Sequence, residues 1–271
     1  ANGGIALGAG SGTLVLNGGT LNLGGNVALT DLVVGHDAVA SYAQSSRIFT
    51  LSRDLTVGSG SGNGTYRLAD SGEFQAAGKI VIGSGTATGR FEWYRAGGLT
   101  TSQITLGNNG TLAMGHDFDA DALLGAGGLV DGLEQATLEL TRGAIAEHDD
   151  DLIRARVLRI GSADGGGTYR LGGAGELEIT SAGCVDVGAS GNPGRFDWHR
   201  EGALSTPRLA LATGSVLSMG FDFDTPQLLD GSLFGGTLSG VETATLEVTR
   251  GAAASQLSGS VKLGHLQLGA A

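Results

Sequence analysis

Alternating carboxylates are the residues of this sequence best placed for chemistry. The stretch HDFDAD holds Asp117, Asp119 and Asp121 at every second position, and FDFDTP holds Asp222 and Asp224 in the same way. At a turn, such a row could offer hard oxygen ligands to Ca²⁺, which usually takes about six to eight oxygens. The row is shorter in the second stretch, and neither stretch carries the GGxGxDx pattern of calcium-binding β-rolls. We therefore predict no cofactor, with Ca²⁺ at Asp117, Asp119, Asp222 and Asp224 as the alternative.

A second acidic cluster, DDD at residues 149–151, directly follows His148. Runs of like charge usually lie on a solvated surface, so we predict an exposed loop between repeats. The histidines provide no repeated ligand pair, because Phe221 stands in the second stretch where His116 stands in the first. The other three are scattered, at His36, His199 and His265.

The enzymatic alternative is a polysaccharide lyase or hydrolase, since many of these enzymes are β-helices with repeats of similar length. Such an enzyme needs one groove that gathers several carboxylates and a basic residue. Here the acids occur in two copies, and lysine occurs only at Lys79 and Lys262. We predict that the protein is not an enzyme and has no catalytic residues, and we keep glycan cleavage or glycan binding as the alternative function.

Two tryptophans could provide a platform for a sugar. Trp93 and Trp198 are each followed by a ring and an arginine, in Tyr94-Arg95 and His199-Arg200, which could form an exposed ridge. Both tryptophans, however, alternate with polar residues in the way that apolar core residues of a strand do. We predict that both are buried.

These residues are positioned by a large internal repeat. The first copy reads GTYRL from Gly64, GRFEW from Gly89, MGHDFD from Met114 and ATLELTRGA from Ala136. The second copy reads GTYRL from Gly167, GRFDW from Gly194, MGFDFD from Met219 and ATLEVTRGA from Ala244. The offsets are 167−64=103, 194−89=105, 219−114=105 and 244−136=108, so one unit occurs twice. We assign residues 48–150 and 151–257 to the copies, 1–47 to leading rungs and 258–271 to the start of a further rung, within one domain.

A shorter repeat of about two dozen residues lies inside the large one, within the range of roughly 20–50 that marks solenoids. Two apolar residues separated by one position, and usually followed by glycine, recur along the chain, as in Leu32/Val34 and Leu55/Val57. Apolar and polar residues alternate around these pairs, which predicts short strands. We expect three strands per rung, in the first rung at residues 5–7, 13–16 and 20–23, and about eleven rungs.

Like residues occupy like places in successive rungs. One position within the rung is occupied by Tyr66, Phe91 and Leu112 in successive rungs. The position two residues later is occupied by Leu68, Trp93 and Met114. Parallel coiling would stack them in columns at about 4.8 Å per rung. A β-propeller needs blades of about 40–50 residues, and a leucine-rich repeat needs a fixed Leu/Asn consensus. We therefore predict an all-β parallel β-helix, with helix only at residues 119–124 or 144–156.

The rungs of this chain resemble Gly-rich right-handed parallel β-helix repeats. The motifs that carry the resemblance are GTYRL, GRF[ED]W, the apolar pair followed by glycine, and ATLE[LV]TRGA at the end of each copy. These repeats occur in large bacterial surface proteins and autotransporter-passenger-like proteins. The resemblance covers nearly the whole chain. It implies a right-handed solenoid that is exported and has a structural or adhesive role, and it implies no shared catalytic residues.

Composition and charge narrow the partners. The chain has 271 residues, 51 glycines and 3 prolines, and a net charge of −11, which disfavours nucleic acid because phosphate binding needs a basic surface. No apolar run approaches the roughly 18 residues of a membrane-spanning helix. We expect an extracellular or cell-surface location. The terminal rungs have free edges, so we expect them to contact either a second copy stacked head to tail or adjoining repeats of a longer chain. Surface glycans are the other partner that we expect.

Overall fold

The chain is a parallel β-solenoid. The computed structural model describes residues 12–21, 25–189, 191–256 and 260–270. Strands hold 51% of the residues and helices 6%, and the solenoid has about ten turns. The predicted fold class is therefore confirmed, with about ten turns where about eleven rungs were expected. The described residues of 1–116 and 129–137 form one compact unit, and the described residues of 117–128 and 138–271 form another.

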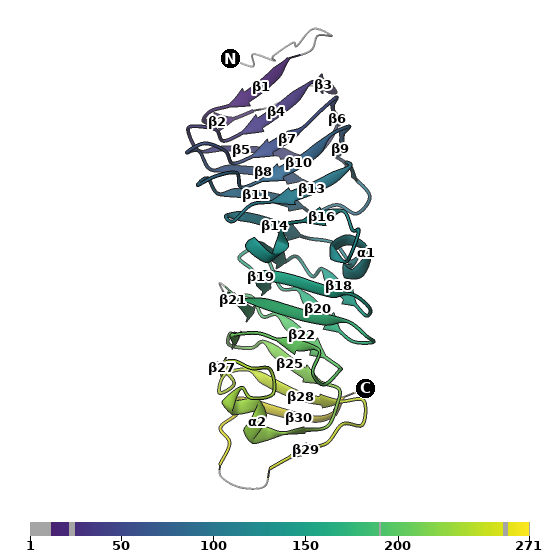
Figure 1. Ribbon diagram of the computed structural model, residues 1–271, viewed down its shortest axis with the longest axis vertical. Helices are drawn as coiled ribbons and strands as arrows, with labels where there is room; N and C mark the ends of the chain where they lie inside the picture. Colours follow the sequence, from purple (N-terminus) through teal and green to yellow (C-terminus); the bar gives the residue numbers. More distant parts are fainter. Residues whose placement is uncertain (1–11, 22–24, 190, 257–259, 271) are drawn as a thin grey trace. The chain divides into compact units, whose positions relative to one another are not determined.

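The first unit contains three parallel sheets, and each successive turn adds a strand to them (Figure 1). One sheet consists of β1 (Thr13–Leu16), β4 (Asp31–Val34), β7 (Leu55–Val57), β10 (Lys79–Ile82), β13 (Gln103–Leu106) and β16 (Val130–Asp131). The second contains β2 (Gly19–Thr20), β5 (Ala40–Gln44), β8 (Gly64–Leu68), β11 (Gly89–Trp93) and β14 (Gly110–Met114). The third contains β3 (Val27–Leu29), β6 (Ile48–Leu51), β9 (Glu73–Ala76) and β12 (Leu99–Thr100). Three short strands per turn are thus confirmed in this unit.

The predicted columns form the core of the first unit. Tyr66 pairs in register with Phe91, and Phe91 with Leu112, and all three are fully buried. The rings of Tyr66 and Phe91 stack with their centroids 5.4 Å apart. The neighbouring column consists of Leu68, Trp93 and Met114. Stacking of like side chains in register is what buries the apolar residues of each turn against those of the next.

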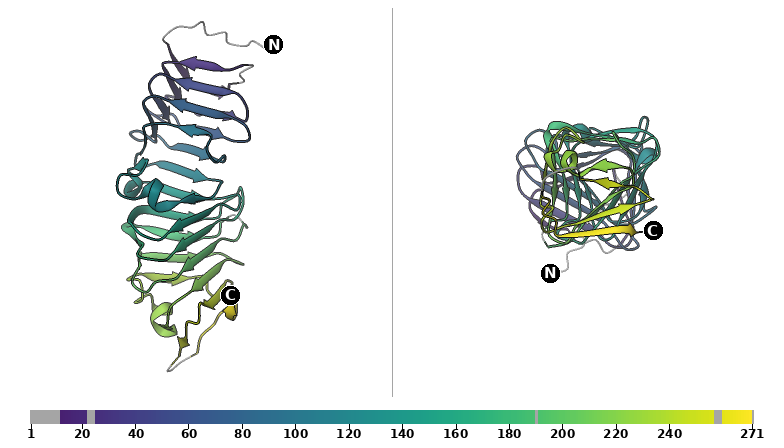
Figure 2. Two further views of the ribbon diagram at one scale, coloured as in Figure 1. Left: turned by 90° about the vertical axis from the view of Figure 1, so that its right-hand side faces the viewer. Right: turned by 90° about the horizontal axis from the view of Figure 1, so that it is seen from below.

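The second unit has two larger sheets and one strand pair. One sheet consists of β15 (Phe118–Asp119), β18 (Ile145–His148), β20 (Thr168–Leu171), β22 (Arg195–Trp198), β25 (Val216–Met219), β28 (Thr245–Thr249) and β30 (His265–Ala270). The other contains residues 138–140 of β17 (Thr137–Leu140), β19 (Leu152–Ile160), β21 (Glu176–Val187), β24 (Arg208–Leu211) and β27 (Thr237–Ser239), with β23 (Leu204–Ser205) on β21. The strand pair is β26 (Phe223–Asp224) with β29 (Ala254–Ser255). Figure 2 shows the strands of this unit following one another in successive turns.

Two long strands change the three-strand pattern in the second unit. β19 and β21 pair over almost their whole length, and the register shifts between Ala155 and Val157. Four residues of β21, at 180–183, bulge at this point, so two strand segments join where a corner separates them in the first unit. The sequence pattern did not predict this fusion, because the first segment of β19 falls in residues 144–156, which were expected as a possible helix.

The first rung is arranged differently from the prediction. Thr13–Leu16 forms the first strand of a turn, since Leu14 pairs with Leu32 and Leu16 with Val34. The prediction made it the second strand, after residues 5–7, which lie outside the described residues. This first described turn is therefore short, with an offset of 32−14=18 residues between paired leucines. The regular spacing of later turns led to the wrong assignment.

Two short helices occupy matching places in the large copies. The predicted helix at residues 119–124 is present as α1 (Ala120–Leu124), and Asp119 caps its N-terminus. Its counterpart α2 (Thr225–Asp230) was not predicted from the sequence, although Pro226 stands in its first turn. Pro suits the first turn of a helix, where its missing N–H costs nothing. The other predicted helical stretch, residues 144–156, is strand in β18 and β19.

Glycine begins the GRFEW motif because the chain of the preceding turn passes very close. A Cβ on Gly89 would lie 2.1 Å from the carbonyl oxygen of Val57, and one on Gly194 would lie 2.0 Å from that of Ile160. No side chain fits at such distances. The first letter of this motif is thus a packing requirement at a corner.

The two large copies end with the same strand pairing. The ATLEL strand β17 lies beside β19, where Gly161 N–H donates to the Leu140 carbonyl over 2.7 Å. The ATLEV strand β28 lies beside β30, with Leu246 opposite Leu266 and Val248 opposite Leu268. β30 therefore corresponds to the second half of β19, the strand that begins a further rung.

Candidate functional site

Three of the four carboxylates singled out as metal candidates bind backbone N–H groups, and the fourth binds a hydroxyl. Asp117 Oδ1 accepts from Ile145 N–H over 2.8 Å, and Asp222 Oδ1 accepts from Ala253 N–H over 2.7 Å, each on the following turn. Asp119 Oδ1 caps α1 by accepting from Ala122 N–H over 3.0 Å. The remaining candidate is Asp224, whose Oδ1 accepts from the Ser255 hydroxyl. Each carboxylate is a structural acceptor at a corner of the solenoid.

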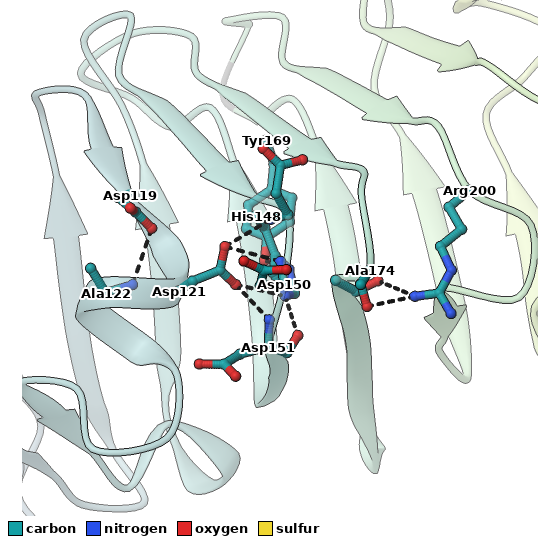
Figure 3. A network of polar contacts seen from close by, with 11 residues as sticks. Asp119, Asp121, Ala122, His148, Asp150, Asp151, Tyr169, Ala174 and Arg200 are labelled. Atoms are coloured by element: carbon teal, nitrogen blue, oxygen red, sulfur yellow. Dashed lines mark hydrogen bonds and ion pairs between the residues drawn. The ribbon is translucent and has the colours of Figure 1, made fainter.

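Asp121 closes the acidic loop that follows His148 (Figure 3). Its Oδ2 accepts from the N–H groups of Asp149 and Asp150 over 2.8 and 3.2 Å, and its Oδ1 accepts from Asp151 N–H over 2.9 Å. Three N–H donors on one carboxylate stabilise its charge and fix the backbone of the loop. The loop at residues 149–151 is partly exposed, as predicted, but its backbone is held by an acid from the preceding turn.

His148 lies at the centre of this network and is fully buried. Its Nε2 lies 2.6 Å from the Asp151 carbonyl oxygen, an acceptor, so Nε2 carries the proton in the neutral ring. Its Nδ1 then accepts from the Tyr169 hydroxyl over 2.8 Å. Burial, and secondarily the charge of Asp121, raise the pKa of Tyr169. The hydroxyl therefore stays protonated and serves as a permanent donor.

The same arrangement occurs in the first unit with glutamine in place of histidine. The Tyr66 hydroxyl donates to Gln44 Oε1, and Gln44 Nε2 donates to the Glu73 carbonyl over 2.7 Å. Gln44 is opposite Leu68 in β8, as His148 is opposite Leu171 in β20. Sequence reasoning missed this pair. The signal in the sequence was a polar residue at a similar distance before each buried tyrosine. Gln44 lies 66−44=22 positions before Tyr66, and His148 lies 169−148=21 positions before Tyr169.

Arginine–carboxylate pairs run across the outer faces of the sheets. Glu92 lies between Arg67 and Arg90, and the Arg90 Nε to Glu92 Oε1 distance is 2.8 Å. In the second unit Asp197 lies between Arg170 and Arg195 in the same way. Further pairs join Arg170 to Glu147 and Arg195 to Glu247.

These pairs sit in a protected environment, because Glu92 and Asp197 are each only 4% exposed. A hydrogen bond to Glu147 raises the pKa of Arg170. Burial alone would lower the pKa of Arg195, but Glu247 and Asp197 raise it overall. Buried carboxylates with two arginines each are more strongly coupled than ordinary surface ion pairs, so the pairs tie neighbouring turns together.

The tryptophans are buried, as predicted. Trp198 is fully buried and Trp93 is 8% exposed. Their indole N–H groups donate to the carbonyls of Arg200 and Arg95, both over 2.6 Å. The exposed ridge considered beside Trp93 is not formed by Tyr94, which is buried under the Arg67 guanidinium at 5.3 Å from its ring centre.

A shallow hollow lies next to the second acidic stretch. Its lining consists of Glu201, Asp222, Phe223, Asp224, Gln227, Leu233, Ala253 and Ser255. Within the described ranges, no group of three or more His, Cys, Asp or Glu side chains is arranged to hold a metal ion. None of the helices in the described part of the chain is long and apolar enough to cross a membrane.

Comparison with known proteins adds no relative to this picture. No protein-family model matches the chain, and neither the curated proteins nor the solved structures searched include a match. The class of protein is therefore established from the structure itself, as a parallel β-solenoid.

Proposed function

We propose that this chain is a structural or adhesive segment of a bacterial surface, exported to the cell exterior, where it assembles end to end with copies of itself. The resemblance of its rungs to Gly-rich surface and autotransporter-passenger-like repeats supports the location and the role. The net charge of −11 keeps a large surface soluble, as an extended segment requires.

The observation that carries the structural role is the tying of successive turns by side chains as well as by backbone ladders. Asp121 binds three N–H groups of the next turn, and His148 binds the tyrosine of the turn after its own. Arginine–carboxylate pairs add a third set of links. A solenoid in which each turn contacts only its neighbours needs such links to resist bending and local opening.

Location and role can be tested separately. Protease treatment of intact cells of the source organism should remove the protein from the surface, with a cytoplasmic enzyme as the protected control. Electron microscopy of the purified chain should show filaments that lengthen with concentration. A protein protected inside intact cells would contradict the location, and particles of one fixed size at every concentration would contradict end-to-end assembly.

Glycan binding is the second candidate function, and the hollow beside α2 favours it. Glu201, Gln227 and Ser255 bring carboxylate, amide and hydroxyl groups to one open surface around Phe223. Such groups suit the hydroxyls of a neutral glycan, whereas the acids would repel an acidic one. Binding to neutral glycans that weakens several-fold in Glu201→Gln, without release of reducing ends, would support this candidate. Depolymerisation lost in Asp222→Ala would instead indicate an enzyme.

A further inference from the structure

β30 presents an apolar sheet edge. It is the last strand of its sheet and pairs with β28 on one side, and no described strand pairs with its other side (Figures 1 and 2). Leu266 and Leu268 take the inward positions above Leu246 and Val248. They are 47% and 67% exposed, among the most exposed large apolar side chains of the described chain.

The equivalent strand in the first copy shows what chemistry covers such an edge. Val157–Ile160 of β19 corresponds to β30, and its far side is covered by residues 184–187 of β21. That covering segment is parallel and in register, with Val185 on Leu158 and Val187 on Ile160. In this covering segment the two apolar residues Val185 and Val187 are separated by one position, and glycine follows directly. An edge of this kind is thus covered by another strand of the same pattern.

β1 has the pattern that the covering strand requires. Leu14 and Leu16 are its inward residues, both half-buried, and no described strand pairs with the side opposite β4. Glycine follows one position later than in β21, after Asn17. β1 and β30 can therefore stack their leucines as the pairs of every intermediate turn do.

The backbone groups of the two edges are also complementary. His265 N–H donates to the Ala244 carbonyl, so His265 and Gln267 bond to β28, while Leu266 and Leu268 direct their N–H and C=O groups to the free side. In β1, the carbonyl of Leu16 accepts from the turn of β4 at Gly35 N–H, so the alternate residue Val15 points to the opposite, free side. Residues whose side chains point inward thus form their backbone hydrogen bonds with the following turn, and residues whose side chains point outward form theirs with the preceding turn.

We propose that β30 of one copy pairs in parallel with β1 of a second copy, with Leu266 on Leu14 and Leu268 on Leu16. This inference rests on the end-to-end assembly proposed above and names its contact. The contact joins two different surfaces, so it can repeat without closing and gives an open polymer.

Two single variants, each altered at one edge, test the contact. Leu268→Asp places a charge on the β30 edge, and Leu16→Lys places one on the β1 edge. Sedimentation velocity on the purified full chain should show polymers for the unaltered protein and monomers for each variant alone. An equal mixture should associate again, because each variant keeps one unaltered edge for the other. Leu152→Asp, at a 40% exposed apolar residue of β19, a strand that pairs with β17 and β21, is the matched control and should polymerise normally.

The outcomes separate the contact from the assembly itself. Polymers that persist in both variants would overturn the β30–β1 contact and leave end-to-end assembly standing. Discrete dimers in Leu16→Lys that are lost in Leu268→Asp would show symmetric pairing of two β30 edges and also overturn the contact. Monomers in the unaltered protein at all concentrations would overturn both proposals. Circular dichroism melts of each variant establish that it is folded, and a third variant, Leu266→Asp, replaces Leu268→Asp if that protein does not fold.

Discussion

Replacing His148 with alanine tests whether the buried polar network holds the second unit together. The change leaves the buried Tyr169 hydroxyl without its acceptor, which costs about 1–3 kcal/mol. The Asp151 carbonyl loses less, because it still accepts from Glu176 N–H over 3.0 Å. The emptied space of a fully buried ring adds about 2 kcal/mol, at the low end of core truncations to alanine. We expect a loss of about 3–5 kcal/mol in the free energy of unfolding.

The matched variant is His148→Gln, because glutamine performs the same task at Gln44. Its amide can accept from Tyr169 and donate to the backbone, as in the first unit. We expect it to stay within about 1 kcal/mol of the unaltered protein, as for other volume-conserving changes. Urea unfolding followed by circular dichroism and by tryptophan fluorescence gives both values. Equal losses in the two variants would refute the role assigned to the hydrogen bonds, since only packing would then matter.

Three further predictions concern the core, the tyrosines and the corners. Trp198→Ala and Trp93→Ala should each lose about 3–5 kcal/mol in thermal or urea unfolding, as other buried aromatics do, and unchanged melts would place the indoles outside the core. Burial raises the pKa of Tyr42 from about 10 to about 12. The folded state keeps the phenol protonated where the unfolded state ionises, so stability present below pH 10 should fall between about pH 10 and 12. Absorbance of tyrosinate against pH, with urea midpoints at each pH, would reveal ionisation near pH 10 if the ring were not buried. Gly89→Ala should destabilise the fold by more than about 3 kcal/mol, because the new Cβ would overlap the Val57 carbonyl. Gly25→Ala is the control and should change stability by less than about 0.5 kcal/mol, because nothing lies within 4 Å of its Cβ position. Similar effects of the two glycine changes in urea unfolding would remove the packing explanation.

The solenoid and its columns could be predicted from the sequence because in-register stacking leaves a direct record in it. Tyr66, Phe91 and Leu112 recur at nearly constant spacing since each must lie on the one before. The short first turn broke that spacing, and the strand at Thr13–Leu16 was then assigned one place too late. Sequence periodicity predicts the strand assignment within a turn only where that turn has the same length as its neighbours.

The polar contacts were less accessible from the sequence. An alternating row of acids suggests a metal site, because spacing alone does not show which donors face the oxygens. In the fold, the backbone N–H groups of a later turn reach Asp117 and Asp121. Gln44 and His148 were equally hard to equate, since they differ in type and share only their distance from a buried tyrosine. Contacts between turns depend on three-dimensional register, which single residues do not record.

The links between turns also determine the order in which the chain can fold. Asp121 meets its donors 149−121=28 to 151−121=30 residues later, and Asp222 meets Ala253 after 253−222=31 residues. Each of these carboxylates is therefore satisfied only once the next turn has been laid on its own. A polypeptide emerging slowly from a ribosome or any narrow exit can fold as it appears, with every finished turn serving as the template for the one that follows.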